Sequence, residues 1–499
     1  MRAVVLQAML VLLGCGPAVA LAAPESSAGG PDPRVVAALY AKVMCSALFI
    51  SGLQEAQVRS EDLAGFPALP IQVDRQKREV TAQAAQVERT ATYHEGFGCT
   101  VRSLGGADPQ LGSDVAPKFY GQQPEEAAHR WRRLQRKLSS PVQKVLAQGF
   151  IESDPERLKR TRALLVLQHN RIIGEQYAPG ITPNTPLPGY SMAKGIALLL
   201  VGMLQQRGWL ALTDRDLLPQ WRIEASDPRR EIQLGHLLRM TSGLEWTESY
   251  DGSDSDLMSM LTLVPSASQY AASKPMALQP DSAQVPDRSS LPLQPGQFWR
   301  YSGGSYEIVS GILRSVIESR GQDYPRFPYE QLFRVAGMTS AQLEAGPDGT
   351  YLLSAFALAT ARDWSRLGQL ILNEYSSHAR HILPAGWIQR SVRQTSLDAD
   401  NSTVGYGAAF WLKPLGAGVP RDTFYLAGLE GQFLAVVPSR DLVVVRLATT
   451  PIDGDWTLRP LMVDLMKVTA PARMQAARAV ARRPRPDVAS RKMSQPAAG

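Results

Sequence analysis

Cysteine and histidine are scarce in this sequence and are not grouped as metal ligands. There are three cysteines (Cys15, Cys45 and Cys99) and six histidines in 499 residues. No cysteine has a ligand spacing typical of zinc, and no pair of histidines has the HExxH arrangement. We therefore expect no metal site, and no motif in the sequence indicates a cofactor.

An excess of charge is missing from most of the chain, although the formal net charge is +7. Residues 471–499 contain seven basic residues and one acidic residue, a net +6, which leaves about +1 for everything else. Nucleic acid is therefore not an expected partner, because binding a polyanion needs a concentrated positive field. We interpret residues 471–499 as a disordered basic tail that would contact anionic envelope surfaces.

Long apolar runs are missing after the N-terminus, so the sequence predicts no transmembrane helix there. Residues 1–22 are typical of a signal peptide, with a positive start at Arg2, an apolar stretch over 3–13 and a small-residue cleavage site at 20–22. We therefore expect a periplasmic or secreted protein. Residues 12–15 also resemble a bacterial lipobox, which would leave a lipid anchor on Cys15.

Removal of Cys15 with the signal peptide would leave two cysteines, Cys45 and Cys99. Two cysteines in an exported chain predict one disulfide between them. The alternative is a pair of buried free thiols.

The length of the chain indicates more than one hydrophobic core. After the signal peptide, we expect an N-terminal α/β segment of unassigned role over 31–123, a linker helix over 124–160 and one large domain over 161–470. The pattern predicts a helix or strand over 35–50, a hairpin over 80–101 and an amphipathic helix over 124–149.

The large domain has strand patterns at both ends and helical patterns between them. Strands are predicted over 162–168 and 172–177, a hairpin over 431–447 and a closing helix over 458–468. The predicted fold class is α+β. One antiparallel sheet is built from the N- and C-terminal parts of the domain and flanked by helices, with a helical lobe inserted.

Ser191 and Lys194 are three residues apart, directly before the apolar run 196–201. This spacing places both side chains on one face at the start of a helix. The hydroxyl would then lie near the positive helix end, with an amine one turn away that accepts its proton. The alternative is that Ser191 is only a helix cap and Lys194 a solvated surface residue.

Two further segments suit the same chemistry. Tyr301 lies in a glycine-rich loop, where a phenol can approach a nucleophile and relay a proton. Residues 426–432 are rich in small side chains and would let an edge strand run beside a substrate. Backbone N–H groups there, at Gly428 and Leu429, would form an oxyanion hole with that of Ser191.

From about 161 to 468, the order of several motifs resembles the serine β-lactamase and penicillin-binding-protein superfamily. The similarity is greatest to the class C-like branch, which includes 6-aminohexanoate-dimer hydrolases and related esterases. The motifs are Ser191-Met192-Ala193-Lys194, Leu237-Leu238-Arg239-Met240-Thr241-Ser242-Gly243-Leu244, Pro295-Gly296, Tyr301-Ser302, Gly337-Met338, Thr360-Ala361-Arg362-Asp363-Trp364, and Gly428 with Gly431-Gln432.

The resemblance implies a β-lactamase/transpeptidase-like fold and three roles. Ser191 would be the acyl-accepting nucleophile, Lys194 its base partner and Tyr301 the second proton carrier. A lysine ordinarily titrates near pH ~10.4, so a lysine base must be desolvated or lie beside another cation.

Two departures bear on the substrate. Gly303 stands where the superfamily has a substrate-binding Asn, and no Lys-Thr-Gly or His-x-Gly is present near Gly428. Without that cation, we expect weak or no penicillin hydrolysis and a small-molecule or peptide-like ester or amide as substrate. The sequence thus predicts an exported serine hydrolase. The alternatives are a penicillin-binding D,D-carboxypeptidase or transpeptidase and a non-catalytic penicillin-recognising sensor or scaffold.

Overall fold

The computed structural model describes residues 31–104, 111, 138–250, 255–279, 291–376, 382–397 and 403–471. The predicted signal peptide with Cys15, residues 124–137 of the predicted linker helix and all but the first residue of the predicted tail lie outside the described residues. Within the described part, no helix has the length and apolar composition to cross a membrane.

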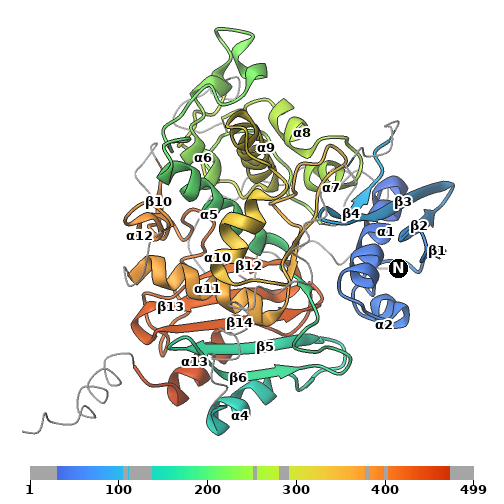
Figure 1. Cartoon of the computed structure of the whole chain (residues 1–499), viewed down its shortest axis with the longest axis vertical. Coiled ribbons are helices and arrows are strands. Elements are labelled where there is room, and N and C mark those ends of the chain that lie inside the picture. The colour runs from blue at the N-terminus through green and yellow to red at the C-terminus, as the bar shows by residue number, and fades with distance from the viewer. Residues whose placement is uncertain are drawn as a thin grey trace, which may run out of the picture.

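An antiparallel sheet of five strands forms the centre of the main body, defined here as residues 138–471 (Figure 1). Its order is β12-β13-β14-β5-β6. The strands are β5 Thr161–Gln168, β6 Arg171–Tyr177, β12 Phe424–Gly428, β13 Gln432–Val437 and β14 Leu442–Ala448. Because β14 pairs with β5, the two ends of the main body share one sheet. The predicted α+β fold class is confirmed.

Helices cover both faces of this sheet. Along β5, Leu164 and Val166 pack with α4 (Ser140–Gln148) and α13 (Leu458–Val468). The alternate residues Leu165 and Leu167 belong to the larger core on the other face, where α11 (Ala361–Ser376) lies against the sheet. Side chains of a strand alternate between faces, so a strand buried on both sides is apolar throughout. The predicted strands at 162–168 and 172–177, hairpin and closing helix are confirmed.

The inserted lobe lies above the sheet in Figure 1 and consists largely of helices. Its central helix is α5, which is buried from Ala193 to Leu204. The surrounding elements are α6 Leu234–Leu238, α7 Asp256–Thr262, α8 Ala267–Ser273, α9 Gly303–Ser319, the π-helical turn Pro328–Phe333, α10 Arg334–Ala336 and α12 Trp387–Ser391. Short strands join them, namely β7 Leu187–Pro188, β8 Gln342–Leu343, β9 Ala357–Ala359, β10 Thr395–Ser396 and β11 Thr403–Val404.

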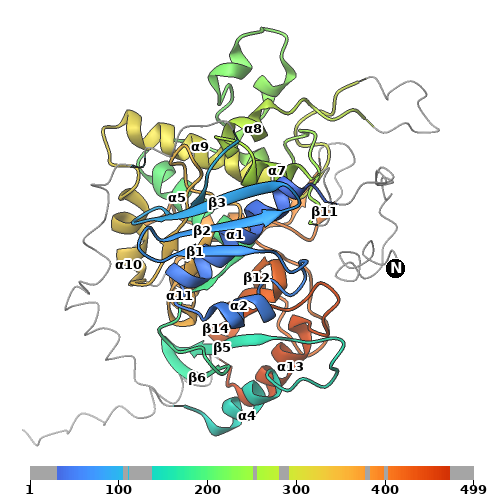
Figure 2. The ribbon, with the colours of Figure 1, turned by 90° about the vertical axis from the view of Figure 1, so that its right-hand side faces the viewer.

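Residues 31–104, called the N-terminal unit below, form a small α/β layer pair beside the main body. Figure 2 shows its sheet in front of α1 (Pro33–Phe49). The sheet contains β1 Ile71–Asp74, β2 Glu79–Ala84, β3 Val87–His94 and β4 Gly98–Val101, and the short helix α2 is Glu55–Ser60. Of residues 35–50, predicted as a helix or a strand, all but the C-cap residue Ile50 are therefore helical, and the predicted hairpin over 80–101 is part of a larger sheet.

The disulfide predicted between Cys45 and Cys99 is present and joins α1 to β4, so the free-thiol alternative is wrong. Both cysteines are fully buried. The bond closes a chain segment with a sequence separation of 54, and cross-linking a loop of that length restricts the unfolded chain.

The predicted amphipathic helix over 124–149 is wrong near its middle. Leu138 and Ser139 are not helical, and α4 begins at Ser140 with a proline in its first turn. Pro141 lacks an N–H, and its ring clashes with a carbonyl one turn earlier, so a helix starts there rather than running through it.

Candidate active site

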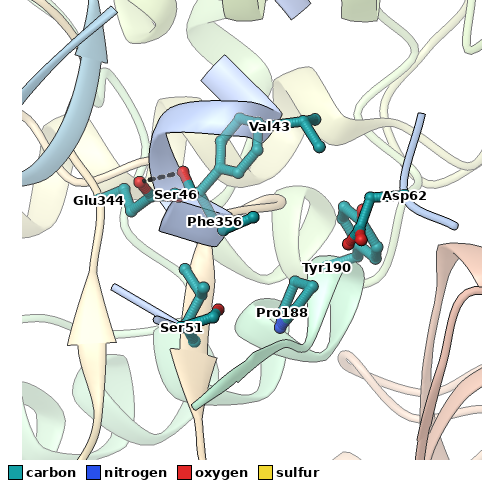
Figure 3. Close-up of a pocket in the computed structure, with 10 residues that line it drawn as sticks. Val43, Ser46, Ser51, Asp62, Pro188, Tyr190, Glu344 and Phe356 are labelled. Carbon is teal, nitrogen blue, oxygen red and sulfur yellow. Dashed lines mark hydrogen bonds between the residues drawn. The ribbon is translucent and has the colours of Figure 1, made fainter. Parts of the chain in front are cut away.

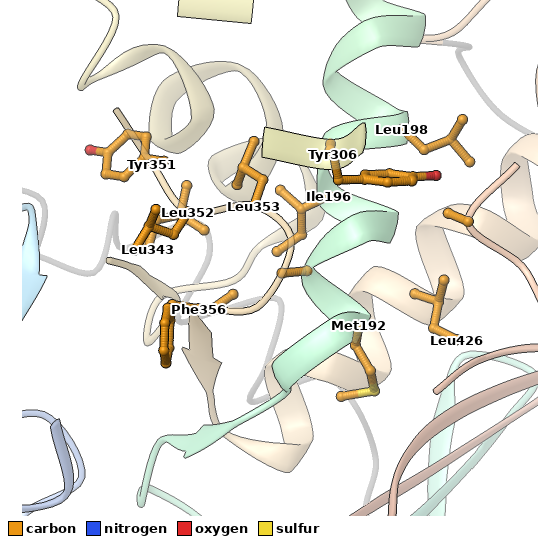
Figure 4. Packing of buried hydrophobic residues seen from close by; sticks show 14 of the residues in the cluster. Met192, Ile196, Leu198, Tyr306, Leu343, Tyr351, Leu352, Leu353, Phe356 and Leu426 are labelled. Atoms are coloured by element: carbon orange, nitrogen blue, oxygen red, sulfur yellow. The ribbon is translucent and has the colours of Figure 1, made fainter. Parts of the chain in front are cut away.

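Ser191 lies in a single 3₁₀ turn, Tyr190–Met192, that leads into α5 (Ala193–Gln206). Apolar side chains of this segment, among them Met192, Ile196 and Leu198, fill the core around the helix (Figure 4). The cap residues are Gly189 for the turn and Met192 for the helix, so the interpretation of Ser191 as a helix cap is wrong. Ser191 itself is half-buried, at the edge of this core.

Lys194 is brought directly to the Ser191 hydroxyl. Its Nζ donates to Ser191 Oγ at 3.0 Å and to the backbone oxygen of Ser354 at 2.7 Å. The side chain is 1% exposed, so the alternative of a solvated surface lysine is wrong. The amine also lies 4.9 Å from the centre of the Tyr301 ring. The structure therefore brings together the three residues predicted to carry the chemistry.

Tyr301 belongs to a group of four aromatic side chains beside the lysine. Its ring stacks on Trp411 with centroids 5.7 Å apart and also lies 6.1 Å from Tyr406 and 6.4 Å from Trp299. Tyr301 precedes α9, whose first turn is capped by Ser302, because that hydroxyl accepts from Ser305 N. The cap fixes the direction in which the chain enters the helix, and hence the position of the phenol.

Gly428 is the last residue of the edge strand β12 and lies against the turn that carries Ser191. A Cβ at position 428 would lie 2.3 Å from the carbonyl oxygen of Gly189, so only glycine permits this approach. Leu429 follows in a 3₁₀ turn, and its carbonyl accepts from Gln432 Nε2 at 3.0 Å. The backbone of this segment thus borders the turn that carries the hydroxyl, which is where an oxyanion hole would be needed.

Gly303 is already hydrogen-bonded within the protein. Its N–H donates to Glu248 Oε2 at 2.7 Å, and Trp246 Nε1 donates to the same oxygen. A Cβ at position 303 would lie 3.2 and 3.3 Å from the two Glu248 oxygens. A carboxyl group from a distant loop therefore fills the space beside Gly303. Burial raises the pKa of Glu248, while the charge of Lys194 acts in the opposite direction.

Glu307 lies behind Lys194 and is completely buried. Its Oε1 accepts from Ser354 N at 2.9 Å, while the carbonyl of the same residue accepts from Lys194. Burial raises the pKa of Glu307 to about 7. The backbone of Ser354 is therefore held between an amine and a carboxyl, which fixes the acceptor that orients Lys194.

Sequence reasoning missed both carboxyl groups. The sequence does single out Glu307, because it is an acid placed directly between the apolar residues Tyr306 and Ile308. Glu248 had none, since it lies in a polar stretch where an acid is unremarkable in sequence. Among the described residues, no three His, Cys, Asp or Glu side chains gather as a metal site.

Comparison with known proteins gives one extended match. Residues 155–462 match the model of the family described as Beta-lactamase. Among curated proteins, none matches this chain.

Several solved structures are similar to this chain at low identity. A Bacillus anthracis protein assigned as a 6-aminohexanoate-dimer hydrolase is 20% identical, with a TM-score of 0.48, over 66% of this chain and 81% of its own. A family VIII carboxylesterase is 15% identical, with a TM-score of 0.49, over 67% and 98%. A penicillin-binding protein from Bacillus halodurans is 15% identical, with a TM-score of 0.44, over 66% and 100%. At these values the likenesses say nothing about substrate.

Proposed function

Since this chain belongs to the beta-lactamase family, we propose that it is an exported serine hydrolase that cleaves an ester or amide through an acyl intermediate on Ser191. The observation that carries the proposal is the 3.0 Å hydrogen bond from Lys194 Nζ to Ser191 Oγ. A buried amine has no evident structural reason to end on a half-buried hydroxyl beside a cluster of aromatic rings.

The reaction proposed has two halves. Ser191 Oγ attacks the substrate carbonyl while Lys194 takes its proton, which forms a C–O bond and a tetrahedral oxyanion. The carbon then releases the leaving group, which receives a proton through Tyr301, and the acyl group stays on Ser191. Water adds to the acyl carbon in the second half and releases the acid, with the same groups carrying the proton. Backbone N–H groups of Ser191 and Gly428 would stabilise the oxyanion.

The surroundings of the hydroxyl favour a substrate with an apolar or aromatic part. Trp299 and Trp411 are half-buried near Tyr301 and offer ring surface to such a group. Glu248 lies where the superfamily pattern has an amide, so an anionic group on the substrate would be disfavoured when this carboxyl is ionised. The carboxyl group supports the expectation of weak or no penicillin hydrolysis, because the β-lactam product and substrate carry a carboxylate.

Export is part of the proposal and rests on the signal-like residues 1–22 together with the disulfide Cys45–Cys99, since disulfides persist mainly in oxidising compartments. The alternative is that the signal is processed at the lipobox-like residues 12–15, which would leave a lipid anchor on Cys15. No cofactor enters the proposed reaction, because an amine, a phenol and a hydroxyl complete both proton transfers.

A fluorophosphonate probe tests the proposal, because it phosphorylates an activated serine. We expect the wild-type protein to be labelled on Ser191 and Ser191→Ala to lose all labelling. Ser273→Ala is the matched control, since Ser273 is an exposed serine at the end of α8. Labelling that persists in Ser191→Ala would refute the assignment.

A labelled penicillin and p-nitrophenyl acetate then separate the remaining alternatives. Steady turnover of the ester without a stable penicillin adduct is the result expected of the proposed hydrolase. A stable penicillin adduct together with ester turnover would favour the D,D-carboxypeptidase. A stable penicillin adduct without ester turnover would favour the sensor.

A further inference from the structure

Residues 31–104 precede the family match, yet they contact the main body directly behind the Ser191 turn. Asp62, which follows α2, accepts from Arg162 Nη1 of β5 at 2.8 Å. Glu61 accepts from Arg162 Nη2 at 2.7 Å. Arg162 is 2% exposed and Asp62 is 8% exposed, so the N-terminal unit places a charge inside the protein. A buried charged pair is costly to break, so its position is well fixed.

The turn before the nucleophile is strained and needs support. Tyr190 has a φ of +44°, which is unfavourable for a tyrosine and costs about 1–3 kcal/mol. The main body packs closely against the neighbouring Gly189 on two sides. A Cβ at position 189 would clash with Trp364, and a Cβ at position 428 would clash with the Gly189 carbonyl. These contacts constrain Gly189 but leave the Tyr190 side chain to other partners.

The Tyr190 side chain points toward acids rather than into a packed core. A cavity lies between the N-terminal unit and the main body, and Figure 3 shows Tyr190 and Asp62 at one side of it and Glu344 at the other. Because the cavity adjoins the ring, packing does not fix Tyr190 there. Burial raises the pKa of the Tyr190 phenol, and the carboxyl group of Glu430 adds to this through its charge and a side-chain hydrogen bond. The same hydrogen bond lowers the pKa of Glu430, whereas burial and the charge of Asp62 raise it.

Glu430 also adopts an unusual backbone conformation, with a φ of +59°. The residue is half-buried, but its Oε2 atom is buried with no hydrogen-bond partner among the described residues. Burial, followed by the negative charge of Asp62, raises the pKa of Glu430 to about 8. Glu430 directly precedes Gly431 in the segment that contains Gly428, so its position affects both the nucleophile turn and the bordering strand.

We propose that Glu430 is a positioning residue for Ser191, acting through Tyr190, and that Asp62 gives the N-terminal unit control over it. The inference rests on the proposed function, because it concerns the reactivity of the same hydroxyl. It assigns residues 31–104 a part in setting the active-site geometry. Below, Glu61, Asp62, Arg162 and Glu430 are called the acid-rich cluster.

The proposal has a pH dependence whose direction is fixed. The groups that face Glu430 are Asp62, Arg162, Arg160 and the phenol of Tyr190. With a pKa of about 8, Glu430 is mainly protonated at neutral pH and ionises above it. Ionisation makes the carboxyl group a stronger acceptor for the Tyr190 phenol, since their hydrogen bond lowers the pKa of Glu430, and it therefore tightens the support of Tyr190. Acylation of Ser191 should therefore speed up as the pH rises through about 8.

The test is the rate of fluorophosphonate labelling of Ser191 from pH 6 to 10 in four variants of the full chain. Tyr190→Phe keeps the ring and removes the hydrogen bond, and we expect labelling to slow by about tenfold because a misplaced nucleophile reacts slowly. Glu430→Gln should remove the rise centred near pH 8. Asp62→Asn should move this rise to lower pH, because a charge that raises the pKa of Glu430 is gone. Glu55→Gln on α2 is the matched control and should behave as wild type.

The outcomes separate the two proposals. Wild-type protein that is not labelled on Ser191 overturns the proposed function, and this inference with it. Wild-type rates and an unchanged pH profile in Tyr190→Phe, Glu430→Gln and Asp62→Asn overturn the inference alone. If Asp62→Asn fails to fold, Tyr190→Phe and Glu430→Gln still decide, since neither removes a partner of Arg162.

Discussion

Among the described residues, two buried ion-pair contacts between the N-terminal unit and the main body differ in charge balance. Lys42 and Glu344 form a pair with N–O 2.7 Å and side chains 2% and 1% exposed. In the acid-rich cluster, Arg162 meets two carboxyl groups, and Glu430 adds a third nearby. In the first contact one cation meets one acid, whereas in the second, burial and the excess of acid raise the pKa of one carboxyl group, Glu430, to about 8. One interface therefore combines a balanced pair with a pH-sensitive contact.

The balanced pair gives the largest expected effect. Lys42→Met leaves Glu344 buried without its cation, although Ser46 Oγ and Cys99 N still donate to it at 2.8 and 2.9 Å. Removal of one partner of a buried pair typically costs about 3–5 kcal/mol. We expect a loss of about 4 kcal/mol of unfolding free energy, measured by urea denaturation. The double variant Lys42→Met/Glu344→Gln should recover most of the loss, and failure to recover would show that packing around Lys42 matters more than charge.

The disulfide supports the same attachment, because Cys45 and Cys99 flank the contacts of Lys42 and Glu344. The replacement of both cysteines by alanine should cost about 3 kcal/mol, since the freed chain gains entropy when unfolded. Labelling of Ser191 in the folded fraction should keep its pH profile, because the acid-rich cluster is untouched. A shifted profile would contradict the separation of the two contacts.

Glu307 provides a buried acid that belongs to the main body alone. Its pKa is about 7 when folded and near 4.5 when unfolded, so the folded state binds the proton more tightly. The stabilisation is therefore complete below about pH 4.5 and is lost as the pH rises to about 7, a change on the order of 3 kcal/mol.

Urea denaturation at pH 5 and pH 8 measures this effect. Glu307→Gln should reduce the difference between the two pH values, and Asp62→Asn should leave the contribution of Glu307 unchanged. An equal difference in Glu307→Gln and wild type would mean that Glu307 does not titrate in this range.

The central sheet could be predicted from sequence because its signal is local. Residues 163–167 are apolar throughout and residues 442–448 are apolar except for Arg446, a pattern typical of strands buried on both faces, and turn residues separate the strands from their neighbours. The pairing of Ser191 with Lys194 also follows from helical spacing, although Ser191 proved to lie in a 3₁₀ turn before the helix. The order of these elements then limited the possible topology.

The contacts of isolated acids could not be predicted in this way. Glu248 reaches Gly303 across 55 positions of sequence, and Asp62 reaches Arg162 across 100. Such contacts depend on how whole elements pack, which no local pattern records. Glu430 had a partial signal, as an acid in a segment otherwise made of small and apolar residues. The extent of the sheet in residues 71–101 was likewise missed, because its first strand has little apolar alternation.

The smallest effect is expected from a charged pair on the surface of the N-terminal unit. Arg59 Nη2 and Glu55 Oε1 of α2 lie 2.8 Å apart, with side chains 34% and 38% exposed. An exposed pair at this helical spacing contributes only about 0.3–0.5 kcal/mol, because water screens it. Arg59→Ala should therefore change urea denaturation by no more than about 0.5 kcal/mol, and the effect should fade in 1 M salt. The pair Lys42–Glu344 has nearly the same distance, 2.7 Å, but is buried, and we expect it to contribute several times more stability. A large effect of Arg59→Ala would therefore show that distance, and not burial, sets the energy of these pairs.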